Sequence, residues 1–106
     1  MSKRDTRALF RKSVFERDGY RCVVCGRHWH PEDVPPELKR INAHHITNRN
    51  LMPNGGYVAE NGVTVCEGRC HMLVERGDAP GYTPADLYHK IGTDWREAAR
   101  KAEELS

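Results

Sequence analysis

The sequence predicts a small α+β domain built around a cluster of four cysteines, with helices at both ends of the chain. Three observations favour this fold class. β-branched and apolar residues gather in two short stretches, residues 40–46 and 63–65, as expected for strands. Apolar residues recur at helical spacing before and after these stretches. The cysteines form two close pairs, and 106 residues is an ordinary length for one domain.

The composition indicates a domain with a small apolar core. Hydrophobic residues make up only 38% of the chain, with two Phe and two Trp, so a metal or a covalent cross-link would add needed stability. No apolar run reaches the roughly 18 to 20 residues of a membrane span, and the start MSKRDTRALFRK lacks the apolar segment of a secretory signal. We therefore expect a cytoplasmic protein without a membrane partner, whose cysteines bind metal rather than form disulfides.

Basic residues are concentrated in the first half of the chain. Residues 1–50 hold 11 Lys and Arg against 6 Asp and Glu, whereas residues 51–106 hold 6 against 9. The first dozen residues carry five basic side chains around a single acid, Asp5. Such a basic segment suits a polyanion such as nucleic acid and makes binding sensitive to salt. The same charges also suit a solvated helix face, so charge alone does not identify a partner.

The N-terminal part of the chain, residues 1–20, predicts one basic helix. Leu9, Phe10 and Val14 form an irregular apolar stripe over residues 6–17. Gly19 stands where a left-handed residue would end this helix.

The middle of the chain, residues 21–77, predicts the core of the domain. RCVVCG is a tight turn, and the three prolines of residues 26–38 indicate an irregular connection. RINAHHI predicts a strand, the Asn- and Gly-rich residues 47–62 predict a loop, and VTV predicts a second, antiparallel strand. CHMLVERG then predicts a short helix that ends at Gly77.

The last part, residues 78–106, predicts two helices. Thr83 suits the N-cap of the first, with Pro84 at its first position and Asp86 three residues after the cap. TDWREAARKAEEL predicts the second. Its apolar residues at helical spacing indicate a face buried in the core: Trp95, Ala98, Ala99, Ala102 and Leu105. His89, within the first of these helices, is interpreted as structural.

The spacing of the cysteines predicts a structural zinc site. Cys22 and Cys25 have two residues between them, and Cys66 and Cys70 have three. Two short-spaced pairs about forty residues apart are typical of tetrahedral Zn²⁺, because each turn presents two thiolates. His28 and His30 lie close enough to be alternative ligands, and a redox-active pair is a weaker alternative because no βαβ pattern is present. A four-sulfur site is closed, so it contributes folding energy and no chemistry.

The histidines outside this cluster follow a recognisable order. His44, His45, Asn61 and His71 fall on a predicted strand, a loop and a helix. The segments CVVC, AHHI, NGVTVC and CH, in this order over residues 22 to about 77, resemble the HNH endonuclease family. The site of that family is a β-hairpin and a helix around one divalent metal, the ββα-metal fold. Taken singly, each histidine would more often be a hydrogen-bonded structural residue, and Asn61-Gly62 a turn dipeptide.

The resemblance implies a role for each of these residues. His45 would be the general base that takes a proton from the attacking water, and His44 and His71 would be ligands of the catalytic metal. Asn61 would hold the loop and the base in place. Phosphodiester hydrolysis suits these residue types, since histidine titrates near neutral pH and a metal stabilises charge on a phosphodiester. Histidine ligands suit Mn²⁺, Ni²⁺, Co²⁺ or Zn²⁺, whereas Mg²⁺ prefers oxygen, so the catalytic ion stays open.

The resemblance further implies the hydrolysis of phosphodiester bonds in double-stranded DNA, leaving 5′-phosphate and 3′-hydroxyl ends. The short format is similar to that of phage or prophage nucleases, and a larger DNA-processing machine is a further expected partner. Six basic residues are candidates for DNA contact: Lys3, Arg4, Arg7, Arg11, Arg49 and Arg69. A non-catalytic zinc-binding module that grips nucleic acid is the main alternative, and a zinc-stabilised protein adaptor is another.

The sequence departs from the family pattern in two places. Three residues, not two, separate the second cysteine pair, and Gly68 is expected to absorb the additional one. Several relatives carry a second histidine four residues after the first helix histidine, where this chain has Glu75. Residues four apart share a helix face, so Glu75 is a candidate third ligand or a partner of a metal-bound water. A carboxylate there would favour Mg²⁺ or Mn²⁺, and an unpaired exposed carboxylate is the alternative.

Overall fold

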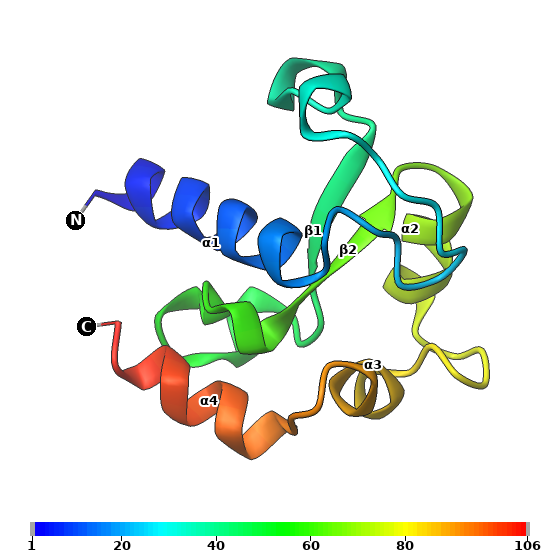
Figure 1. Cartoon of the computed structure of the whole chain (residues 1–106). Helices are drawn as coiled ribbons and strands as arrows, with labels where there is room; N and C mark the ends of the chain where they lie inside the picture. The colour runs from blue at the N-terminus through cyan, green and yellow to red at the C-terminus, as the bar shows by residue number, and fades with distance from the viewer. Residues whose placement is uncertain (1, 106) are drawn as a thin grey trace.

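The computed structural model describes residues 2–105 and has a small two-stranded sheet with helices around it (Figure 1). The elements in order are α1 (Lys3–Arg17), β1 (Ile41–His45), β2 (Gly62–Cys66), α2 (Arg69–Arg76), α3 (Pro84–Lys90) and α4 (Trp95–Glu103). Short 3₁₀ turns interrupt the connections before each strand. The predicted α+β class is confirmed in this coarse form. None of the described helices is long and apolar enough to cross a membrane.

The two strands form an antiparallel hairpin, as predicted. Ile41 lies opposite Cys66, and His45 lies opposite Gly62. The second strand is longer than the predicted residues 63–65 because Gly62 and Cys66 also pair. Gly62 has a packing role, since a Cβ there would stand 2.6 Å from Val14 Cγ2. Glycine therefore lets α1 close against the hairpin.

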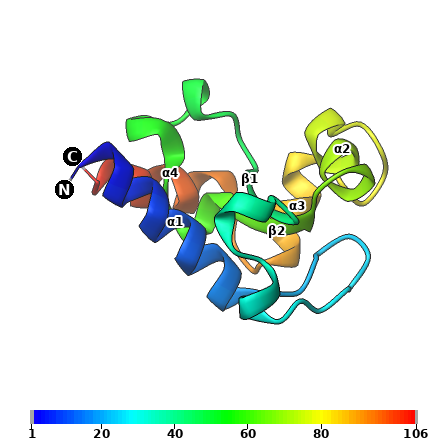
Figure 2. The same cartoon turned by 90° about the horizontal axis from the view of Figure 1, so that it is seen from above.

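Two apolar clusters cover the two faces of the hairpin. One joins α1 to β1 and is formed by Phe10, Val14, Phe15, Val34 and Ile41. The other joins β2 to α2, α3 and α4. It contains Cys22, Ile46, Met52, Val63, Val65, Val74, Leu87, Tyr88, Ala98 and Ala102. Figures 1 and 2 show α1 and α4 to the left of the hairpin and α2 to its right. α3 lies at the end of the hairpin next to Asn61, to which its Tyr88 donates a hydrogen bond. The loop between the strands packs on α4.

Local capping explains where the helices begin and end. α1 begins at Lys3, three residues before the predicted start, because the Ser2 hydroxyl accepts a hydrogen bond from the Asp5 N–H at 3.1 Å. The predicted cap of α3 is present as a reciprocal pair between Thr83 and Asp86. α2 ends at Arg76 and is followed by Gly77, which has the left-handed conformation expected from the sequence.

The predicted buried face of α4 is only partly correct. Ala98 and Ala102 are fully buried, as expected. Trp95 is 51% exposed and Leu105 is 42% exposed, so their assignment to the core is wrong. The physical reason is the extent of the helix. α4 covers Trp95–Glu103, so Trp95 is its first residue and Leu105 lies beyond its end, at the margins of the contact.

Candidate functional site

The four cysteines converge on one point between the ends of the hairpin and α2. Cys22 and Cys25 come from the turn after α1, Cys66 ends β2 and Cys70 lies in the first turn of α2. Their four sulfur atoms all lie within 4.8 Å of one another, and Cys25 Sγ is 3.7 Å from Cys66 Sγ. Zn–S bonds of about 2.3 Å in a tetrahedral site place sulfurs about 3.8 Å apart. The donor set therefore fits a zinc ion.

Backbone hydrogen bonds and burial shift the pKa values of three cysteines in this cluster. Burial disfavours a thiolate at Cys22, but N–H groups of Cys25, Cys66 and Val24 donate to its sulfur and lower its pKa to about 7. Burial raises the pKa of Cys66 to about 11, and burial together with nearby Cys22 raises the pKa of Cys70 to about 12. Four thiolates together therefore require a cation to share their charge.

The alternative ligands His28 and His30 lie outside this cluster. Their rings contact each other edge to face, with centroids 5.3 Å apart. Trp29 between them supports the cluster, because its indole N–H donates to Cys66 Sγ at 3.3 Å. Among residues 2–105, only the four cysteines form a group of metal-ligating side chains this compact.

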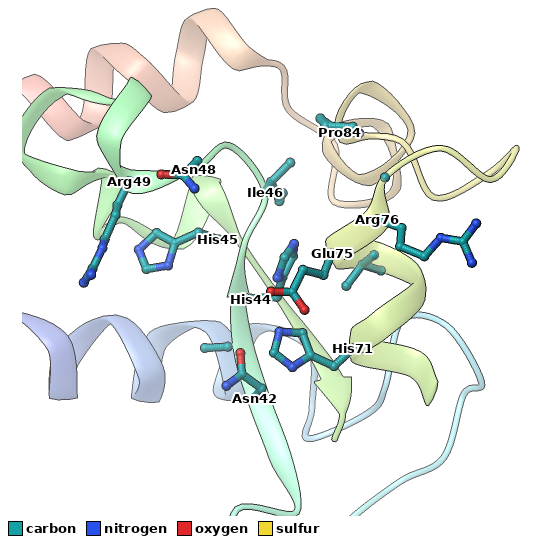
Figure 3. A pocket seen from close by; sticks show the side chains of 13 residues that line it. Asn42, His44, His45, Ile46, Asn48, Arg49, His71, Glu75, Arg76 and Pro84 are labelled. Carbon is teal, nitrogen blue, oxygen red and sulfur yellow. The ribbon is translucent and has the colours of Figure 1, made fainter. Parts of the chain in front are cut away.

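A cavity of about 400 Å³ lies between β1 and α2 and is lined by the predicted histidines (Figure 3). His44 and His45 reach it from β1, and His71 and Glu75 reach it from α2. Figure 3 shows His44, His71 and Glu75 gathered on the α2 side, whereas His45 points away from them towards Arg49. Neighbouring residues on a strand alternate in direction, so the two adjacent histidines border the cavity from different sides.

His44 and His71 face each other across this cavity. Their ring centroids are 5.4 Å apart in an edge-to-face arrangement. Burial first, and then nearby His71 and His45, lower the pKa of His44 to about 4, so its imidazole stays neutral and keeps a free lone pair at pH 7. His71 Nδ1 lies 3.1 Å from Glu67 Oε1, which orients the ring. A histidine pair in which His44 is neutral and His71 is oriented by Glu67 is suited to bind a metal ion.

His45 sits in an aromatic enclosure on the other side of the strand. Its ring stacks on Phe10, with centroids 4.6 Å apart, and meets the Tyr57 ring edge to face at 4.7 Å. Burial, and then the charge of Arg49, lower the pKa of His45. Its Nε2 is buried without a hydrogen-bond partner in residues 2–105. A buried, unpaired nitrogen costs about 1–3 kcal/mol and calls for an explanation.

Asn61 is fully buried and holds the loop that follows His45. Its side chain accepts a hydrogen bond from Thr47 N at 3.0 Å and donates to Thr47 O at 3.1 Å and to Gly56 O at 3.2 Å. Its backbone carbonyl accepts from Ile46 N at 2.9 Å. Asn61 does not line the cavity, so it is a positioning residue for the chain next to His45.

Tyr88 of α3 belongs to the same network and was not identified from the sequence. Its hydroxyl donates to Asn61 Oδ1 at 2.6 Å and lies 2.6 Å from Thr47 Oγ1. In the sequence, Tyr88 is one of several apolar residues of a short helix. The available signal was its hydroxyl, since a tyrosine buried in a core requires a polar partner.

Replacing Tyr88 with Phe is expected to lower the free energy of unfolding by about 0.5–1.5 kcal/mol, because the buried Asn61 oxygen loses one of its two donors and keeps the Thr47 N–H. Urea denaturation followed by circular dichroism measures this loss. Tyr82→Phe is the matched control, since the Tyr82 ring packs at the edge of the core. Equal effects of the two substitutions would show that the hydroxyl of Tyr88 contributes nothing specific.

The six predicted DNA contacts do not all line one cavity. Lys3, Arg7 and Arg49 line a second cavity on the α1 side of His45. Arg11 is half-buried, with its guanidinium 4.8 Å from the centroid of the Phe15 ring. The other two are exposed outside both cavities: Arg4 and Arg69.

Three comparisons were made with known proteins. Profiles of protein families, curated proteins and solved structures give no match to this chain. The residues and contacts described above must therefore carry any assignment of function. They comprise a closed set of four sulfurs and, beside it, a cavity with neutral histidines on both of its sides.

Proposed function

We propose that this chain is a metal-dependent endonuclease of the HNH type that hydrolyses phosphodiester bonds of DNA. One observation carries the proposal. His44 and His45 diverge from the end of β1 and line one cavity, in which His44 meets His71 of α2 at 5.4 Å. A hairpin and a helix thus bring a candidate metal-binding pair and a separate, neutral base to one space.

Three tasks are divided among the side chains that line the cavity and Asn61 next to it. His44 and His71 would hold a divalent ion, with the exposed carboxylate of Glu75 beside them. Such an ion supplies charge neutralisation for a phosphate oxygen and for the departing 3′ oxygen. His45, kept neutral by burial, accepts the proton of the attacking water. Asn61 holds the backbone after His45, so the base keeps its position.

The four cysteines would bind one structural Zn²⁺ in this proposal. The fit of the sulfur spacing to a tetrahedral ion supports it, as does the small size of the apolar core. The ion would tie the turn after α1 to the junction of β2 and α2. Because His71 follows Cys70 directly, the same ion would hold the first turn of the helix that carries the metal-binding histidine.

A plasmid cleavage assay tests the proposal. Purified protein is incubated with supercoiled DNA and, separately, Mg²⁺, Mn²⁺, Ni²⁺ or Zn²⁺. We expect nicked or linear DNA with at least one of these ions. DNA binding without cleavage under all four conditions would favour a non-catalytic nucleic-acid-binding module. The grouping of Lys3, Arg7 and Arg49 around one cavity supports that second candidate, because it needs no base.

Replacing Glu75 with Gln is expected to raise the metal concentration for half-maximal cleavage by about 10–100-fold. The reason is the loss of a carboxylate from the helix face that also carries His71. A titration of the active ion against the initial cleavage rate measures the change. Glu32→Gln, an exposed substitution outside the cavity, is the control. An unchanged metal requirement in Glu75→Gln would remove this residue from the site.

A further inference from the structure

A second cavity, of about 360 Å³, lies between the start of α1 and the loop that follows β1. Lys3 and Arg7 reach it from α1, Arg49 reaches it from the loop, and Tyr57 forms part of its wall. No Asp or Glu lines it within residues 2–105. Three cations around one cavity without a carboxylate repel one another, so an anion placed between them would be stabilised.

Tyr57 holds the two arginines at this cavity. Arg49 Nη1 donates to the Tyr57 hydroxyl at 3.2 Å, and the Arg7 guanidinium carbon lies 5.9 Å from the centroid of the Tyr57 ring. In the described part of the chain, Lys3, Arg7 and Arg49 form no ion pair with a carboxylate. Their charges therefore remain available to a ligand. Two guanidinium groups bind the oxygens of a phosphate more strongly than they bind a neutral hydroxyl group.

The second cavity is directly connected to the proposed catalytic base. The Tyr57 ring touches His45 edge to face at 4.7 Å, and Arg49 lines both cavities. An anion bound by Arg7 and Arg49 therefore lies next to the group that His45 would act on. A polymer with regularly repeated phosphates is suited to occupy both places at once.

We propose that Lys3, Arg7, Arg49 and Tyr57 form a binding site for a backbone phosphate of nucleic acid, next to the phosphodiester at His45. This inference rests on the proposed function, because it assumes that the DNA strand bound at this site also passes His45. Of the six basic residues that are candidates for DNA contact, three are assigned to this phosphate site: Lys3, Arg7 and Arg49. Contacts of this kind position the strand and do not read its sequence.

Arg7→Gln and Arg4→Gln form a matched pair for the first test. Both arginines are exposed on the first turns of α1, but only Arg7 lines the cavity. Binding of a fluorescent DNA duplex is measured by anisotropy without added catalytic metal, at several salt concentrations. We expect Arg7→Gln to bind about tenfold more weakly and to lose about 0.9 from the slope of log K against log salt. Equal losses in both variants would overturn a defined site.

The second test removes the charge from the DNA instead of the protein. Single methylphosphonate groups are placed one at a time along one strand of the duplex. Wild-type protein is expected to lose about tenfold in affinity at one position. The Arg7→Gln protein should be insensitive at that same position, because the contact is already lost. Full sensitivity in Arg7→Gln, or none in wild type, would overturn the proposal.

A competition experiment distinguishes backbone phosphate from free phosphate. Inorganic phosphate is titrated against the bound duplex and, in parallel, against protein alone. Displacement only at concentrations far above that of the duplex supports a nucleic-acid site, whereas comparable affinities would assign the cavity to free phosphate. These measurements record binding and not cleavage. A positive phosphate scan with no cleavage in any metal would overturn the nuclease but retain the phosphate site.

Discussion

Replacing His45 with Ala is expected to lower the rate of DNA cleavage by about 10²–10⁴-fold while DNA and metal binding persist. The imidazole of His45 is half-buried and neutral, and among the described residues that line the cavity the one carboxylate, Glu75, lies on the α2 side. Single-turnover nicking of a plasmid, with saturating metal and with protein in excess over DNA, measures the loss.

Two controls make this result interpretable. His45 stacks on Phe10, so the Ala protein is compared with wild type by urea denaturation and assayed where both are folded. His89→Ala removes an exposed histidine from α3, outside the cavity, and should cut at the wild-type rate. Undiminished cleavage by His45→Ala would refute its role as the base. Loss of DNA binding together with cleavage would instead indicate that the ring is needed for the fold of the site.

Removing the proposed Zn²⁺ from the four cysteines is expected to unfold the domain. Structural zinc contributes apparent binding energies of about 10–16 kcal/mol in small domains, and the total stability of a protein is about 5–15 kcal/mol. The two apolar clusters here are small and include Cys22 itself. Far-UV circular dichroism before and after a strong chelator, with elemental analysis of the metal, measures the effect. Re-addition of one equivalent of Zn²⁺ should restore the spectrum.

Substitutions distinguish the four cysteines from the nearby histidines as zinc ligands. Cys22→Ser is expected to abolish zinc retention, because this sulfur is buried and accepts three backbone N–H groups. A protein with both His28→Ala and His30→Ala should retain one zinc per chain, since neither ring belongs to the cluster. A folded protein without metal, or equal zinc loss in both variants, would contradict the assignment.

Much of the fold could be predicted because its elements depend on short patterns. The β-branched residues of VTV predicted β2, and the pattern RINAHHI predicted β1. Alternation along β1 explains why His44 and His45 point to different sides. The Thr83 cap predicted the start of α3. The errors lie at element ends, as with the exposed Trp95 of α4, where burial depends on how far a neighbouring element extends.

Short stretches of sequence suffice to predict the local features of this protein: the cysteine pairs, the two strands, the caps and the order of the histidines. The surroundings of these features depend on the tertiary fold. Tyr88 meets Asn61 across 27 positions and Thr47 across 41, and Phe10 of α1 stacks on His45. The physical reason is that such contacts are set by the packing of whole elements. The sequence around a residue therefore does not indicate which distant side chains pack next to it.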